Sequence, residues 1–316
     1  MPSAISGGPE AAGLPFLNLN GKIWFGHVHK AAGNSMTLLI ESSPGVISCN
    51  TTSASFSSRM FTAAYIPKGI GKERRWTQSE AMWRLAQWWF DPHPNCTFGT
   101  AEIAGLGGLH ASVRDEWAST AGRDLPAARS GAASPAEPAL ITVYRDPVDL
   151  CRSYWRQRFR KSPAGMQRTN PEWFVRECCS EYLTRAFFRR PGDPRPGANT
   201  TTPIDPGEVL RWLDSRRVFL GLSDLFGVST CLYWFQSGQL QRFSAECACG
   251  GISDPIHENT GLTTIPQLNV SDEFILAHAV NSSLLYRAIR AEFLARVRRV
   301  EAVTGVQLLC VNSTYT

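Results

Sequence analysis

Short apolar segments alternate with stretches of helical pattern along most of the sequence. The segments that predict buried strands are residues 22–28, 96–103, 139–144 and 217–222. The stretches that predict helices are residues 34–41, 79–90, 146–161, 171–190, 205–215, 223–236, 271–280 and 282–303. Strands that alternate with helices indicate an α/β protein, with a mostly parallel central sheet that is flanked by helices on both faces.

The rest of the sequence predicts loops around a single domain. A length of 316 residues fits one large domain or two small ones, and no internal repeat marks a second domain. Residues 1–20 are rich in Gly, Ala, Pro and Ser, so we expect a flexible leader there and one domain over residues 21–316. Surface loops are expected at 42–72, 119–138, 191–206 and 245–268.

The charge balance favours an anionic ligand but not a nucleic acid. The chain carries 32 Lys and Arg against 27 Asp and Glu, which gives a formal net charge of +5. This excess suits an anionic small molecule or glycan, and it is far below the basic density of a protein that binds DNA as histones do. No apolar run reaches the about 18 residues that a membrane-spanning helix needs.

Potential glycosylation sites and cysteines both point to the secretory pathway. Six of the eleven Asn residues open an Asn-x-Ser/Thr sequence, namely Asn50, Asn95, Asn199, Asn269, Asn281 and Asn312. The nine cysteines exceed what a reduced cytosolic enzyme needs, and an odd number leaves at least one free or bonded to another chain. Because the N-terminal residues lack a signal-peptide pattern, we expect a luminal domain whose N-terminal membrane anchor is absent from this chain. Accidental sequons and merely buried thiols are the alternative.

Neighbouring cysteines limit the possible disulfides. Cys178 and Cys179 are consecutive residues of a predicted helix, and Cys247 and Cys249 are separated by one residue. Bonds over such short separations are strained, so each of these cysteines is expected to find a distant partner.

The first segment with chemical meaning is residues 25–36, where an apolar strand leads through small residues into a helix. Consecutive backbone N–H groups at such a turn, together with the positive end of the helix, bind a phosphate. The residues expected to line this site are Lys30, Ala31, Ala32, Gly33, Asn34, Ser35 and Met36, with Lys30 as a mobile cation. The Gly-Lys-Ser/Thr ending of a Walker A loop is missing, which disfavours an ATPase or GTPase. Taken alone, the segment also fits an ordinary strand–turn–helix.

A second anion-binding segment follows the predicted strand at 139–144. That strand delivers Arg145 at its carboxyl end, the edge at which open α/β sheets bind ligands. Asp146 and Pro147 fit the cap and the first position of the next helix, and Ser153 lies about two helical turns beyond the bend. Arg145 and Ser153 are therefore expected to bind one phosphate from two sides. The plainer alternative is a capped helix with a surface arginine.

Together these segments resemble the 5′-phosphosulfate and 3′-phosphate motifs of sulfotransferases that use 3′-phosphoadenosine 5′-phosphosulfate (PAPS). Residues 27–35 (HVHKAAGNS) are similar to the family pattern HVPKTGGTS, and residues 145–154 (RDPVDLCRSY) are similar to its RDP…R…SY pattern. The similarity is closest to the Golgi carbohydrate enzymes that include heparan sulfate uronosyl 2-O-sulfotransferases. It implies a P-loop-like fold, PAPS as cofactor, a Golgi location and in-line transfer of a sulfuryl group to a carbohydrate hydroxyl.

The sequence departs from the family pattern inside the first motif. His29 replaces Pro, and Ala31, Ala32 and Asn34 replace Thr, Gly and Thr, so the turn stays small but loses a hydroxyl donor. His27 and His29 alternate along a strand and face opposite sides, which argues against a metal site. No other Cys or His cluster has zinc spacing, and we expect no metal.

The transfer implied by the resemblance needs a general base, for which two candidates lie between the motifs. Glu102 ends the second predicted strand, where the uronosyl enzymes carry a His-Gly-His sequence and the related glucosaminyl 3-O-sulfotransferases use a glutamate. His110 is the second candidate, and the sequence does not decide between them. Asp91 and His93 are weaker candidates. Residues 257–260 (HENT) lie in a late loop, which in the family closes over the nucleotide.

Basic and aromatic residues favour an anionic glycan as the acceptor. The basic clusters are Arg156, Arg158, Arg160 and Lys161, then Arg189 and Arg190, and then Arg296, Arg298 and Arg299. Trp83, Trp88 and Trp89 are candidates for stacking on sugar rings. A tyrosine of a secreted protein and a small hydroxylated metabolite stay open as acceptors. A P-loop-like nucleotide kinase and an inactive glycan-binding module stay open as other functions.

Overall fold

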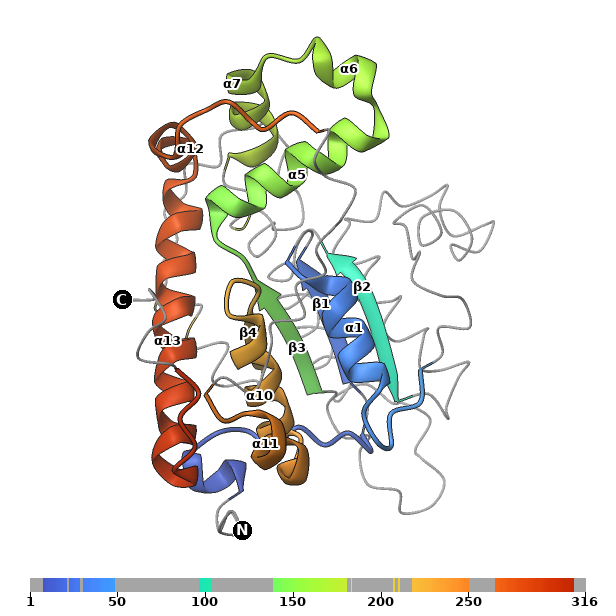
Figure 1. The fold of residues 1–316 in the computed structure, drawn as a ribbon, viewed down its shortest axis with the longest axis vertical. Coiled ribbons are helices and arrows are strands. Elements are labelled where there is room, and N and C mark those ends of the chain that lie inside the picture. Colours follow the sequence, from blue (N-terminus) through green and yellow to red (C-terminus); the bar gives the residue numbers. More distant parts are fainter. Residues whose placement is uncertain are drawn as a thin grey trace, which may run out of the picture.

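A parallel sheet lies at the centre of the molecule, as seen in a computed structural model of the chain (Figure 1). The structure describes residues 8–21, 23–28, 31–48, 97–103, 139–180, 183, 207, 210, 218–249 and 265–309. Within these residues the strands are β1 (Ile23–Val28), β2 (Phe98–Ile103), β3 (Ala139–Tyr144) and β4 (Phe219–Leu222), in the order β2-β1-β3-β4. All of them fall inside the segments predicted as strands, and every pair is parallel, so the α/β class is confirmed.

The register of the strands brings their carboxyl ends to one edge of the sheet. His27 of β1 lies opposite Glu102 of β2 and Val143 of β3, and Tyr144 of β3 lies opposite Leu222 of β4. The last four residues of β3 and all of β4 are buried. Burial on both faces explains why these strands are continuous apolar runs instead of alternating ones. The chain therefore leaves β1, β3 and β4 from a shared edge.

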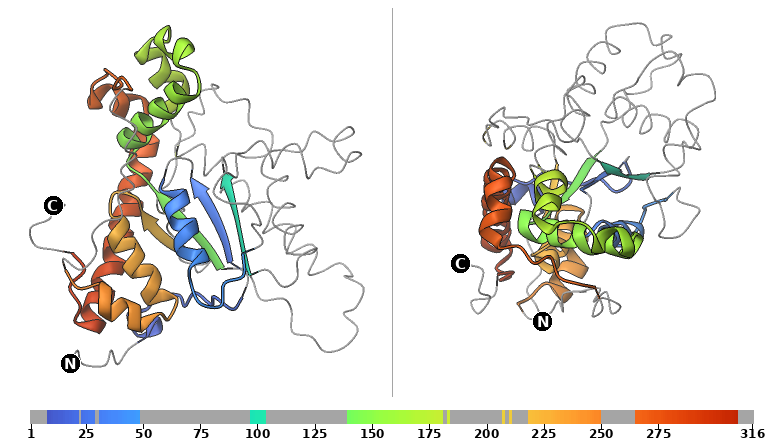
Figure 2. Two further views of the ribbon diagram at one scale, coloured as in Figure 1. Left: turned by 45° about the vertical axis from the view of Figure 1, so that its right-hand side comes forward. Right: turned by 90° about the horizontal axis from the view of Figure 1, so that it is seen from above.

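Among the described residues, helices cover one face of the sheet and one of its sides (Figure 2); helices on the other face, which the sequence also predicts, would lie outside the described residues. The helical elements are η1 (Pro9–Ala12), α1 (Gly33–Glu41), α5 (Pro147–Lys161), α6 (Pro163–Gln167), α7 (Pro171–Phe174), η2 (Val175–Cys179), α10 (Phe226–Gln236), α11 (Leu240–Glu246), α12 (Asp272–His278) and α13 (Val280–Thr304). Helices α1 and α10 lie on the same face, and α13 runs beside β4 (Figures 1 and 2). The helix expected at 79–90 and most of the one expected at 205–215 lie outside the described residues.

The helices that follow β3 form a second, smaller core. The main core combines the sheet with α1, α10 and α13. The smaller one, which we call the cap cluster, buries Val148, Cys151, Trp155, Phe159, Met166, Phe174, Val175, Cys179, Leu268 and Ile275. These residues come from α5, α6, α7, η2, α12 and the segment before α12. In Figure 1 these helices lie above the carboxyl ends of the strands.

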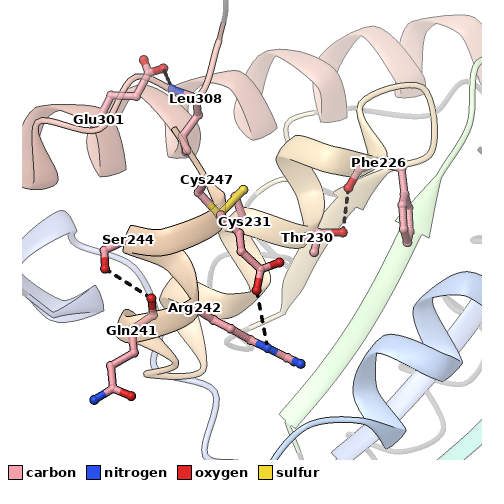
Figure 3. Close-up of a disulfide and its surroundings, with 10 residues drawn as sticks. Phe226, Thr230, Cys231, Gln241, Arg242, Ser244, Cys247, Glu301 and Leu308 are labelled. Atoms are coloured by element: carbon pink, nitrogen blue, oxygen red, sulfur yellow. Dashed lines mark hydrogen bonds and ion pairs between the residues drawn. A yellow bond between two sulfur atoms is a disulfide. The ribbon is translucent and has the colours of Figure 1, made fainter. Parts of the chain in front are cut away.

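Disulfides fasten both cores. Within the described residues, Cys151 of α5 is bonded to Cys179 of η2, and Cys231 of α10 is bonded to Cys247 just after α11 (Figure 3). The bonds span 28 and 16 residues, which confirms that Cys179 and Cys247 pair with distant partners rather than with their neighbours. Disulfides persist in oxidising compartments, so these bonds fit a secreted or luminal protein. None of the helices in the described part of the chain is both long and apolar enough to cross a membrane.

The helix expected at 171–190 differs from the prediction within residues 171–180; of the remaining residues only Leu183 is described, and it is helical. Its cap is confirmed, because the Asn170 side chain accepts a hydrogen bond from the backbone N–H of Trp173 at 3.0 Å. The regular helix α7 is short, however, and passes into the π-helical turn η2, which ends at the extended backbone of Ser180 (ψ 122°). The wider turn keeps Val175 and Cys179 in the cap cluster, where Cys179 meets its disulfide partner.

The N-terminal segment also differs from the expected flexible leader over residues 1–20. From residue 8 onward it packs against the main core, to which it contributes Ala12, Leu14, Leu17 and Leu19. The backbone N–H of Leu17 donates to the carbonyl oxygen of Gln236 in α10 at 2.8 Å. Burying the leucines outweighs the freedom that the surrounding Gly, Ala and Pro residues would otherwise give.

Candidate functional site

The strand order defines a candidate binding edge between β1 and β3. From β1 the chain passes to β2 on one side and then to β3 on the other, so the direction of strand addition reverses between β1 and β3. Parallel sheets bind ligands outside the carboxyl ends of the strands at such a point. Both segments singled out in the sequence start there, since one follows Val28 and the other follows Tyr144. The fold thus brings the two turns to neighbouring strand ends.

The turn after β1 leads into α1 through a residue with unusual backbone geometry. Ala32 lies in the left-handed region (φ 52°, ψ 28°), and no other non-glycine residue in the described ranges has a positive φ. This conformation costs an L-residue about 1–2 kcal/mol, and such strain is found most often at functional sites. Ala32 has no polar side chain with which to cap the first N–H groups of α1. Those N–H groups, at the positive end of the helix, are the donors that an anion requires.

The other residues of this turn are small or buried. Ala31 is fully buried, Gly33 is buried and Ser35 is half-buried. Met36 is fully buried too, and its N–H donates to the carbonyl oxygen of Ala32 at 3.0 Å, so it supports the turn from inside. Small residues let a phosphate approach the backbone closely. Lys30 and the side chain of Asn34 lie outside the described residues.

In the turn after β3, the side chain of Asp146 caps the N-terminus of α5. The Asp146 carboxylate accepts hydrogen bonds from the backbone N–H groups of Val148 (2.9 Å) and Asp149 (3.3 Å), and Pro147 takes the first helical position. The predicted cap is therefore confirmed. Because Asp146 already occupies these donors, contact with an anion at this turn depends on the side chain of Arg145.

Arg145 is half-buried at the carboxyl end of β3. Burial lowers its pKa, the carboxylates of Asp149, Asp224 and Asp146 raise it, and the positive charge of Arg156 lowers it. An arginine keeps its proton against shifts of this kind, so a fixed positive charge stands at the candidate edge. Burial also raises the pKa of Asp146, an effect that its two backbone hydrogen bonds oppose.

Ser153 lies half-buried on the second turn of α5. The helix is fastened on both sides of this residue, since Cys151 is bonded to Cys179 of η2 and Arg152 forms an ion pair with Asp272 of α12. These contacts hold α5 against η2 and α12, the neighbouring elements of the cap cluster. Ser153 therefore has a defined position on the helix that starts directly after Arg145 and Asp146.

Two further residues at this edge were not predicted as site residues. Asp224 comes two residues after the end of β4, and the hydroxyl of Tyr286 in α13 donates to its Oδ1 at 2.6 Å. The ends of β3 and β4 are tied together, because the N–H of Ser223 donates to the carbonyl oxygen of Tyr144 at 2.8 Å. A charged residue just beyond a predicted strand is the signal that identified Arg145, and it could have identified Asp224 as well.

The described residues do not decide which candidate is the general base. Glu102 lies opposite His27 of β1, one residue before β2 ends, so its backbone is at the candidate edge. Its side chain lies outside the described residues, as do His110, Asp91, His93 and residues 257–260.

The basic clusters differ in exposure. Along α5, Arg158 stacks on the ring of Tyr154 (5.2 Å to the centroid) and donates to its hydroxyl (3.0 Å), and Arg160 and Lys161 are exposed. These side chains form an accessible basic surface that leads away from Arg145. Arg189, Arg190, Trp83, Trp88 and Trp89 lie outside the described residues.

Arg296 does not belong to a surface cluster, and that expectation is wrong. Its side chain is only 1% exposed, and it donates to Glu292 Oε1 at 2.9 Å and to the carbonyl oxygen of Val218 at 2.8 Å. A buried arginine is stable only when it is paired in this way. Its charge thus holds α13 against the start of β4 and is not presented to a ligand.

Comparison of the chain with protein-family models, with curated proteins and with solved structures gives no match in any of the three. The resemblance to sulfotransferases therefore depends on the two sequence segments.

Proposed function

We propose that this chain is a PAPS-dependent sulfotransferase that acts on a carbohydrate hydroxyl. The observation that supports it most is the position of the two motif-like segments, which follow the neighbouring parallel strands β1 and β3. One nucleotide with phosphates at both its 5′ and 3′ positions can occupy two anion sites that share an edge. A chain that merely happened to contain both patterns would have no reason to bring them to adjacent strands.

The two turns receive different parts of the cofactor in this proposal. The N–H groups at the start of α1, with Ser35 and Lys30, hold the 5′-phosphosulfate, and Arg145 and Ser153 hold the 3′-phosphate. The residues that the structure describes fit this role, because Ala32 leaves the α1 terminus uncapped by its own side chain and Arg145 supplies a fixed charge. When bound, PAPS supplies the sulfuryl group. Lys30 then stabilises negative charge that develops on the leaving oxygen.

A general base must also take the proton of the acceptor hydroxyl. Glu102 and His110 are the candidates for this role. The place of Glu102 in β2, beside the end of β1, supports a base that faces the same edge as the first turn.

The acceptor in this proposal is an anionic glycan. Its support is the basic surface of Arg158, Arg160 and Lys161 on α5, the helix that also carries Ser153. Flexible basic side chains on a helix surface attract a polyanion with strong dependence on salt. A luminal enzyme of the Golgi fits the disulfides and the six sequons. A protein tyrosine and a small metabolite are the other acceptors to test.

The proposal is tested by ligand-dependent thermal stability followed by transfer. We expect 3′-phosphoadenosine 5′-phosphate to raise the melting temperature of the full chain, and ATP with Mg²⁺ not to do so, because only the former carries a 3′-phosphate for Arg145. Labelled sulfate from PAPS should then appear on one or more members of a panel of desulfated glycans. Stabilisation by ATP alone would favour the kinase instead. Stabilisation without transfer to any glycan, tyrosine peptide or small hydroxyl compound would favour an inactive binding module.

A further inference from the structure

Arg145, Asp224 and Tyr286 lie near the carboxyl edge of the sheet although they come from three separate parts of the chain. Arg145 follows β3, Asp224 follows β4, and Tyr286 lies on α13. The hydrogen bond from the Tyr286 hydroxyl to Asp224 Oδ1 is 2.6 Å long. The N–H of Ser223 donates to the carbonyl oxygen of Tyr144 at 2.8 Å, so the residues that follow these two, Asp224 and Arg145, are neighbours at the edge of the sheet. The expected roles of Arg145 leave this arrangement unexplained.

We propose that Tyr286 is a positioning residue, which engages the carboxylate of Asp224 and so lowers the negative charge that a phosphate meets beside Arg145. The inference rests on the proposed function, because it assigns to Tyr286 a role in the affinity of the 3′-phosphate site.

The chemistry of the three groups explains why such a residue is needed. A carboxylate near an arginine repels a phosphate that approaches the same arginine. A hydroxyl that donates to the carboxylate uses one of its acceptor sites and spreads its charge, which weakens that repulsion. The distance of 2.6 Å between the oxygens is typical of a short charge-assisted bond.

The surroundings of Tyr286 suit a permanent donor. Its ring is only 5% exposed and belongs to the main core, which fixes the position of the hydroxyl. Burial, followed by the negative charge of Asp224, raises the pKa of Tyr286, so the hydroxyl keeps its proton at every physiological pH. The donor therefore cannot be lost by titration, and its effect on Asp224 is constant.

The experiment is a double-mutant cycle read out as affinity for 3′-phosphoadenosine 5′-phosphate by calorimetry. Tyr286→Phe keeps the buried ring and removes the donor, so the unmasked carboxylate should weaken binding by about fivefold. Asp224→Asn removes the repelling charge, so binding should be at least as tight as in the wild type. The double variant should bind like Asp224→Asn, because Tyr286 acts only through the charge of Asp224.

A matched control separates this role from general packing. Tyr233→Phe removes another buried tyrosine hydroxyl, one that contacts Ser43 at 3.0 Å, and it should leave the affinity unchanged. The inference is overturned if Tyr286→Phe binds like the wild type, or if the double variant is as weak as Tyr286→Phe. If the wild type itself does not bind the nucleotide, the proposed function fails first.

Discussion

The two turns at the carboxyl edge of the sheet treat the N-terminus of the following helix in opposite ways. The β3–α5 turn ends in Asp146, whose carboxylate accepts hydrogen bonds from Val148 and Asp149. The β1–α1 turn ends in Ala32, which is held in the left-handed region and has no side chain that can cap. Both termini attract negative charge. At α5 the Asp146 carboxylate supplies this negative charge. At α1 the cap residue, Ala32, supplies none.

This difference implies that two anion sites on one edge are built from different groups. At α1 the donors are backbone N–H groups, which most side-chain substitutions leave in place. An anion loses access to them only when a new side chain blocks the turn or brings a negative charge to it. At α5 the Asp146 carboxylate already accepts from the first N–H groups, so binding depends on the side chains of Arg145 and Ser153, of which Arg145 supplies the charge. Substitutions at the two turns should therefore reduce the affinity for the nucleotide through different groups. The following experiments test this difference.

Deleting Arg145 should have the largest effect. We expect Arg145→Ala to weaken binding of 3′-phosphoadenosine 5′-phosphate by about 100-fold, because a charge-assisted contact contributes up to about 3 kcal/mol. Calorimetry measures the affinity. The control is Arg168→Ala, which removes the same charge at an exposed position after α6 and should change the affinity by less than about twofold. Equal affinities of the two variants would show that the β3–α5 turn does not bind the ligand.

Giving the β1–α1 turn a carboxylate should have the next largest effect. Ala32→Asp brings to α1 the charge that Asp146 brings to α5, and Asp tolerates the left-handed region better than Ala. We expect the free energy of unfolding to stay level or rise, while affinity for the nucleotide falls by about tenfold or more through charge repulsion.

Ala32→Asn is the matched control, since it has the same shape without the charge and tolerates the same backbone conformation. It should retain most of the affinity. If Ala32→Asp and Ala32→Asn bind equally well, the α1 terminus does not bind the phosphate. Urea unfolding at the same pH separates lost affinity from lost folding.

Both turns could be predicted from sequence because each depends on neighbouring residues. An apolar run, a small or capping residue and a helical pattern follow one another within a few positions, and β3 has the predicted bounds of 139–144. A shared edge for the two turns also follows from parallel pairing, whereas the position of β3 next to β1 is seen only in the structure. What local sequence could not show is the left-handed backbone of Ala32, because alanine rarely adopts it.

Contacts between distant parts of the chain could not be predicted. Tyr286 and Asp224 are 62 positions apart, and no local pattern links a helix residue to a strand end at that separation. The same is true of the leucines before β1, whose burial depends on α10 and α13 being present. The π-helical turn within the helix expected at 171–190 has a related cause, since Val175 and Cys179 pack in the cap cluster with residues far away in the sequence.

Changing the cap of α5 should have the smallest effect, and this effect is on the free energy of unfolding. Asp146→Ala removes the acceptor for Val148 and Asp149 and should lower the free energy of unfolding by about 1 kcal/mol. Asp146→Asn keeps an acceptor oxygen and should lose less, since Asn caps about as well as Asp. Urea unfolding of the three proteins measures the difference.

The pH dependence of the Asp146→Asn variant tests the burial of this carboxyl. Burial raises the pKa of Asp146 on folding, so its contribution to stability is present below the pKa of the unfolded chain and is lost as the pH rises through the raised pKa. The variant lacks this loss. Between about pH 3 and pH 7, stability should therefore shift in favour of Asp146→Asn relative to the wild type. A shift in favour of the wild type would mean that the two backbone hydrogen bonds, and not burial, dominate the pKa of Asp146.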